Sequence, residues 1–121
     1  MKGRTKDTKI VDVCDALGNP TRYRIVKALR DHSVVSCCDR LEYHENAASV
    51  ADVMAMTGLA QATASQHLAV LVAAGILRRE KRETWSCYFL NAAAIDGFIE
   101  DLTDELGTAA LSREGGHPRR G

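Results

Sequence analysis

The segment 57–77, TGLAQATASQHLAVLVAAGIL, limits the possible folds of this chain more than any other stretch. A Gly-bearing turn at its start is followed by apolar side chains that recur every three or four residues, as on one face of a helix. They are Ala64, Leu68, Leu71 and Val72. The other face carries short hydrogen-bonding side chains: Gln61, Thr63, Ser65, Gln66 and His67. This pattern predicts the second half of a helix-turn-helix, with a polar helix end suited to base edges in a DNA major groove.

The same periodicity predicts four further helices. Two of them precede the segment, over residues 7–18 and 19–30, and a third begins at Ser49, whose side chain can cap it. The last follows Asn91, and its apolar stripe consists of Ile95, Phe98, Ile99, Leu102 and Leu106. Residues 31–48 remain open between a loop, a short extra helix and a strand turn.

A β-hairpin is predicted over residues 78–90, because Trp85, Cys87 and Phe89 alternate with polar or aromatic neighbours. Its basic residues would hold backbone phosphates or enter the minor groove: Arg78, Arg79, Lys81 and Arg82. Arg22 and Arg24 are equally consistent with such contacts and with ordinary surface charges.

The expected fold is therefore mainly α with a small β-hairpin, a winged helix-turn-helix. Residues 1–110 would form the DNA-binding and dimerisation domain, and residues 111–121, rich in Gly, Pro and Arg, a disordered tail. We expect the first and last helices to pair across a two-fold axis, since their apolar stripes have little core to cover.

Composition excludes several classes of protein. The 16 basic and 16 acidic residues give zero net charge, so the chain does not coat nucleic acid through charge alone. No apolar run is long enough to span a membrane, and the charged N-terminus has no apolar segment behind it, as a secretory signal would. A cytoplasmic protein without a membrane partner is the resulting expectation.

Three stretches resemble the ArsR/SmtB family of bacterial metal- and stress-sensing repressors: ALGNPTRYRIVKAL, SVADVMAMTGLAQATASQHLAVLVAAGIL and RREKRETWSCYFL. Together they span roughly residues 16–90. The resemblance implies a homodimer that binds a double-stranded operator with an inverted repeat, represses an operon, and is released by an effector. It implies no enzymatic activity.

The chain also departs from the family pattern. The arsenic- and cadmium-sensing branches carry thiolates at the start of the first helix of the helix-turn-helix, where this chain has Ser49, Ala51 and Met54. The zinc-sensing branch uses Asp and His on the last helix, where this chain has acids but no His. The cap of the recognition helix, commonly Ser, is Ala60. Any metal site must therefore lie elsewhere.

Cys37 and Cys38 are adjacent in a polar stretch, where packing gives little reason for two thiols. As(III) and Sb(III) favour three thiolates, and Cd(II) and Pb(II) also favour sulfur. We therefore expect an effector site made of Cys14, Cys37 and Cys38. Cys14 has an alternative role as a small core residue on its helix. For Cys87, packing is the favoured interpretation.

Other functions remain open beside the metalloid-responsive repressor. In a thiol-based redox or reactive-sulfur sensor of the same fold, an external oxidant would oxidise the vicinal pair, or would link one of its thiols to Cys14 or Cys87. A small thiol-dependent enzyme would use Cys37 or Cys38 with His44, but the chain shows no phosphate loop or acid pair. A winged helix that binds only proteins is a further alternative.

Overall fold

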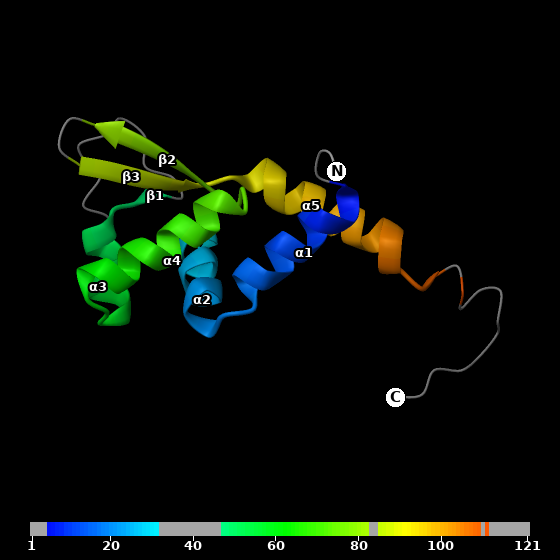
Figure 1. Ribbon diagram of the computed structural model, residues 1–121, viewed down its shortest axis with the longest axis horizontal. Coiled ribbons are helices and arrows are strands. Elements are labelled where there is room, and N and C mark those ends of the chain that lie inside the picture. Colours follow the sequence, from blue (N-terminus) through cyan, green and yellow to red (C-terminus); the bar gives the residue numbers. More distant parts are fainter. Residues whose placement is uncertain (1–4, 32–46, 83–84, 110, 112–121) are drawn as a thin grey trace.

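The computed structural model describes residues 5–31, 47–82, 85–109 and 111, with the backbone alone for Arg82 and Trp85. This part of the chain contains α1 (Lys6–Leu17), α2 (Pro20–Arg30), β1 (Ala47–Ala48), α3 (Val50–Thr57), α4 (Gln61–Ala73), β2 (Leu77–Arg82), β3 (Trp85–Leu90) and α5 (Ala92–Leu106). Figure 1 shows α3, α4 and the sheet toward one end of the molecule, and α1 beside α5 toward the other. The mainly α, winged helix-turn-helix architecture is confirmed.

Two glycines shape the ends of the helix-turn-helix. Gly58 follows α3 with φ 78° and Gly75 follows α4 with φ 83°, both in the left-handed region that side chains disfavour. The Gly58 N–H donates to the Met54 carbonyl at 2.8 Å, and the Ile76 N–H donates to the Leu71 carbonyl at 3.0 Å. These bonds close the last turns of both helices, and they direct the chain from α3 into α4 and from α4 into β2.

The helix N-termini are capped unequally. Asn19 Oδ1 accepts from the Thr21 and Arg22 N–H groups at the start of α2. At α3, the Ser49 N–H donates to Asp52 Oδ2 at 2.8 Å and the Asp52 N–H donates to Ser49 Oγ at 3.1 Å, which is a capping box. Ala60, by contrast, gives α4 no side-chain cap, so the start of the recognition helix lacks a side-chain acceptor for its first N–H groups.

The main core lies between α2, α3, α4 and one face of the sheet. The inner side of α4 is almost fully buried, since Ala64, Leu68 and Leu71 are each 0 % exposed. They pack in one cluster with Ala16, Ile25, Val26, Leu29, Ala48, Val53, Ile76, Leu77 and Tyr88. Burial of this side leaves the opposite side of α4 as an outer surface.

The sheet has one strand more than the predicted hairpin. Its order is β1-β3-β2, antiparallel throughout, and Ala47 and Ala48 pair with Phe89 and Tyr88. Tyr88 faces the main core, whereas Ala47, Cys87 and Phe89 form a second buried cluster. Two alanines carry no strand signature, and β1 forms because its backbone pairs with the free edge of β3.

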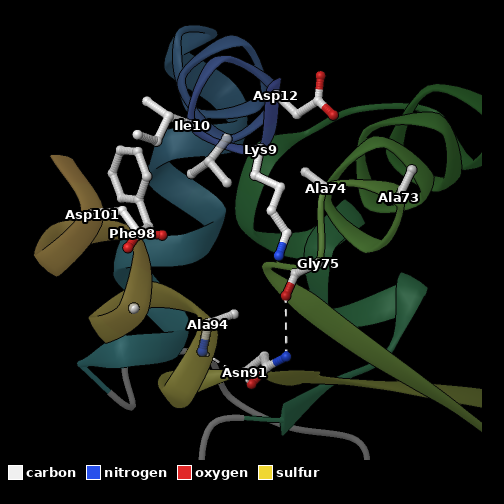
Figure 2. A pocket seen from close by; sticks show the side chains of 12 residues that line it. Lys9, Ile10, Asp12, Ala73, Ala74, Gly75, Asn91, Ala94, Phe98 and Asp101 are labelled. Carbon is white, nitrogen blue, oxygen red and sulfur yellow. Dashed lines mark hydrogen bonds between the residues drawn. The ribbon is translucent and has the colours of Figure 1, made fainter. Parts of the chain in front are cut away.

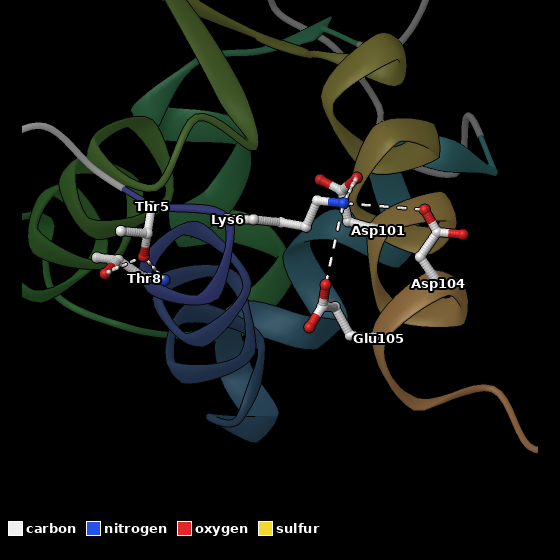
Figure 3. Close-up of polar contacts among 6 residues, drawn as sticks. All are labelled: Thr5, Lys6, Thr8, Asp101, Asp104 and Glu105. Carbon is white, nitrogen blue, oxygen red and sulfur yellow. Dashed lines mark hydrogen bonds and ion pairs between the residues drawn. The ribbon is translucent and has the colours of Figure 1, made fainter.

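The first and last helices pack on each other within one chain. Lys6 of α1 lies among Asp101, Asp104 and Glu105 of α5, with Nζ to carboxylate distances of 3.8–4.0 Å (Figure 3). These groups are well exposed, so each pair contributes little to stability. The alternative core role of Cys14 is wrong, because its side chain is exposed, whereas Ile10 and Ala16 hold the buried positions of α1.

None of the described helices is long and apolar enough to cross a membrane. The proposed tail, residues 111–121, lies outside the described residues apart from the exposed Leu111. The segment left open at 31–48 is described only at Asp31, which caps α2, and at the two residues of β1.

The missing cap of α4 gives a stability prediction. Ala60→Ser should stabilise the fold by about 1 kcal/mol, because a serine hydroxyl can accept from the free N–H groups of the first turn. Ser49→Ala, which dismantles the capping box of α3, should cost a similar amount. Denaturant unfolding of both variants beside the parent chain measures the two changes. An unchanged midpoint for Ala60→Ser would mean that the first turn is already satisfied.

Candidate nucleic-acid interface

The outer side of α4 is the surface on which the predicted base-reading residues lie. Gln61, Thr63 and Gln66 are exposed, while Ser65 and His67 are half-buried at the margins of the surface. The surface is less polar than the sequence pattern indicates, because Ala62 and Ala69 are also exposed there. Small alanines beside Gln66 leave the backbone of α4 open to close approach. The amides and hydroxyls can donate to, or accept from, base edges.

The turn before α4 is held by its own polar side chain. Thr57 Oγ1 donates to the Val53 carbonyl at 2.7 Å and accepts from the Leu59 N–H at 3.2 Å. This arrangement ties the end of α3 to the residue that leads into α4. The uncapped N–H groups of α4 then lie at its start, where the positive end of the helix dipole favours an anion such as a phosphate.

The basic residues of the β2–β3 hairpin are not equivalent. Arg78 stacks over the Phe89 ring at 5.3 Å and pairs with Glu80 at 3.6 Å. The Arg79 Nε donates to Ser86 Oγ at 3.2 Å, and Lys81 is exposed. Strand register places Arg78 and Glu80 on one face and Arg79 and Lys81 on the other. The hairpin therefore offers positive charge on both faces, with two of its arginines already oriented by neighbours.

Arg22 is the functional candidate that the sequence pattern did not separate from surface charges. It lies in the first turn of α2 and is half-buried. Its Nε donates to the Ala16 carbonyl at 2.8 Å, and its Nη1 contacts His67 Nδ1 at 3.3 Å. Arg24 is exposed on the same helix, as expected of a surface charge. The sequence holds one signal for this placement. Asn19 and Pro20 start α2 only two residues after the end of α1, so a residue in the first turn of α2 must lie near that end.

The cysteines expected to form an effector site are only partly described. Cys14 is exposed and free on α1, while Cys37 and Cys38 lie outside the described residues. Among the side chains that the structure describes, no three His, Cys, Asp or Glu residues gather as a metal site requires. Cys14 is therefore not a core residue, and its thiol is available to a ligand.

Cys87 has the packing role that the sequence favoured, and a covalent one beside it. It is fully buried beside Ala47 and Phe89, and it is disulfide-bonded. The Cys87 side chain thus both fills the second buried cluster and takes part in a disulfide bond.

A cavity of about 440 Å³ lies between α1, the end of α4 and the start of α5. Figure 2 shows the Lys9 side chain extending toward Gly75, with Ile10 and Phe98 on the opposite side. The Asn91 Nδ2 donates to the Gly75 carbonyl at 3.1 Å and joins the two helix ends. The cavity lies where the exit of α4 meets both terminal helices.

Comparison with known proteins agrees with this geometry. A family model described as a helix-turn-helix domain matches residues 17–80. An uncharacterized HTH-type transcriptional regulator of Methanocaldococcus jannaschii is 29 % identical over 84 % of this chain and 98 % of its own length. A putative arsenical resistance operon repressor of Halobacterium salinarum is 28 % identical over 80 % of this chain and 71 % of its own length.

Solved structures share the fold at lower sequence identity. An ArsR-like transcriptional regulator from Rhodococcus superimposes with a TM-score of 0.66 at 18 % identity, over 91 % of this chain and 90 % of the other. A homodimeric winged helix-turn-helix DNA-binding domain from Mycobacterium bovis gives a TM-score of 0.58 at 20 % identity over 100 % of both chains. Because the family model spans more than half of the 121 residues, the chain belongs to the helix-turn-helix domain family, and it shares its winged fold with the ArsR-like regulator from Rhodococcus.

Proposed function

We propose that this chain is a transcriptional repressor that binds operator DNA as a homodimer and leaves it when an effector binds. The observation that carries the proposal is the outer surface of α4, defined by the exposed Gln61, Thr63 and Gln66. It is held outward by a fully buried inner side and flanked by a basic hairpin. A rigid helix with short polar side chains and an adjoining positive wing matches what major-groove reading and phosphate contact require.

The dimer is supported by the surfaces of α1 and α5. No residue of α5 is fully buried within the chain, and its apolar side chains Ile99 and Leu106 are 53 % and 70 % exposed. Val11 of α1 is 62 % exposed. A second copy that packs α1 and α5 against their counterparts would cover these side chains and place two α4 helices on one duplex. The Mycobacterium bovis relative is homodimeric by description. The matching operator would be an inverted repeat.

Operator reading can be tested by replacing two neighbouring side chains of α4. Gln66→Ala with His67→Ala should lower affinity for the native promoter about hundredfold or more, since each lost base contact is worth about 1–3 kcal/mol. Filter binding of promoter fragments at several salt concentrations measures the loss and the number of phosphate contacts. Lys27→Ala with Asp31→Ala, which removes an exposed ion pair at the end of α2 without changing the net charge, is the control. Full protection of the operator by the α4 variant would refute the assignment.

Dimerisation can be tested separately from DNA binding. Ile99→Glu should raise the dimer dissociation constant about hundredfold or more, because it would bury an unpaired carboxylate in the interface. Sedimentation velocity over a range of protein concentrations measures the change. Tyr23→Glu is the matched control, since Tyr23 is a similarly exposed apolar side chain (51 %) on α2. Equal effects of both substitutions, or a monomeric parent chain, would contradict the proposal.

For the effector, we propose a thiophilic metalloid or metal, As(III) or Sb(III) before Cd(II) or Pb(II), held by Cys14, Cys37 and Cys38. Support comes from the exposed, free thiol of Cys14 and from the arsenical resistance repressor among the relatives. A soft ion bound by thiolates would tie α1 to the segment that precedes α3, and so change the separation of the two α4 helices.

A redox-sensing repressor is the second candidate, and the disulfide at Cys87 favours it. We propose that Cys87 pairs with Cys37 or Cys38 on oxidation. Since β3 is the central strand of the sheet, such a bond joins the wing directly to the segment before β1.

One set of variants separates the two effectors. Under the metalloid proposal, Cys37→Ser and Cys38→Ser each keep operator binding but lose release by As(III) or Sb(III), whereas Cys87→Ala keeps it. Under the redox proposal, Cys87→Ala loses release by peroxide, and metalloids have no effect on any variant. Fluorescence anisotropy of labelled operator, with reduced protein at the start, follows release. Metalloid release that survives in both serine variants excludes the proposed site.

A further inference from the structure

One guanidinium connects the end of α1, the start of α2 and the recognition helix. The Arg22 Nε donates to the Ala16 carbonyl at 2.8 Å, and Nη2 donates to the Asp15 carbonyl at 3.4 Å. Both acceptors belong to the last turn of α1, and the Asp15 carbonyl also accepts from the Gly18 N–H at 3.2 Å. The remaining nitrogen, Nη1, lies 3.3 Å from Nδ1 of His67 on α4. His67 is half-buried beside the exposed Gln66.

The chemistry of this contact determines where the imidazole carries its proton. A guanidinium has only donors, so Nδ1 of His67 must be the acceptor and must be unprotonated. The proton of the neutral ring is then on Nε2. The two ring nitrogens lie on different sides of the imidazole, and Nε2–H is therefore directed away from Arg22. His67 becomes a donor of fixed orientation.

We propose that Arg22 is a positioning residue for DNA recognition: it holds the His67 ring so that Nε2–H donates to an acceptor atom on the operator. The inference rests on the proposed function, because it assumes that α4 meets DNA. The acceptor is a phosphate oxygen or the N7 atom of a purine, which share this chemistry. A ring held in this way discriminates against base edges that present only donors. Because the ring is already oriented, it loses little conformational entropy on binding.

Arg22 also has a structural part to play at the α1–α2 corner, and a double-mutant cycle separates the two roles. Arg22→Met keeps an unbranched apolar stem, shorter than that of arginine, and removes every side-chain donor. It should weaken operator binding about tenfold, or 1.4 kcal/mol, in the parent chain. In the His67→Ala background it should weaken binding less than about twofold, since the target of the contact is gone. Arg24→Met, the matched loss of one exposed charge on α2, should have the same small effect in both backgrounds.

Equal losses from Arg22→Met in both backgrounds would overturn the inference, because a corner that merely supports the fold acts independently of His67. Thermal unfolding shows whether each variant is folded. If Arg22→Met does not fold, nitrogen-15 NMR of the histidine ring in the parent protein decides instead. In mildly alkaline buffer, where histidine side chains are generally neutral, Nε2 should be protonated and Nδ1 bare. A protonated Nδ1 overturns the inference.

Modified operators identify the acceptor and keep the two proposals apart. Methylphosphonate at single phosphates, or 7-deazapurine at single bases, should at one position weaken the parent protein about tenfold and leave His67→Ala unaffected. If no modification distinguishes the two proteins, His67 donates to neither acceptor and the inference fails. A parent protein that does not bind its promoter refutes the proposed function itself, whereas binding with an additive Arg22 effect refutes only the role of Arg22.

Discussion

Burial of the inner side of α4 is the interaction on which the other features depend. Ala64, Leu68 and Leu71 are fully enclosed by α2, α3 and the sheet, and each fully buried leucine contributes about 1.5–3 kcal/mol. The same contact orients the helix, since a helix with one side locked in a core can present only its opposite side. Loosening this packing would misplace every outer side chain at once. A structural role for the inner residues and a recognition role for the outer ones are therefore parts of one arrangement.

The terminal helices show the opposite balance. They contact each other through a few partly buried residues and an exposed cluster of ion pairs around Lys6, which stabilises them little. Much of their apolar surface remains open within one chain. The core under α4 is complete in a single copy, whereas α1 and α5 would bury much more apolar surface against a second copy. In the dimer that we propose, such a division would allow the separation of the two α4 helices to change while each core stays folded.

Arg22 and the two described cysteines lie where the stable and the open parts meet. Arg22 joins the last turn of α1 to His67 of α4, and Cys14 lies in that same last turn. Cys87 is at the other edge of the core, in the central strand of the wing. Cys14 thus lies on the helix whose end Arg22 contacts, and Cys87 lies on the strand that carries the core residue Tyr88.

Local patterns in the sequence were sufficient for the helices, the turn and the hairpin, because caps, glycines and periodicity act between residues three or four apart. The helix starts at Pro20 and Val50 and the exits at Gly58 and Gly75 follow from such rules. Contacts between distant segments were decided only by the tertiary structure: the strand at Ala47, the exposure of Cys14, the link at Cys87, and the contact of Arg22 with a histidine 45 positions away. A side chain's own neighbours along the chain specify its helix face. They do not specify which other segment supplies its partner, since that depends on how all the elements pack together.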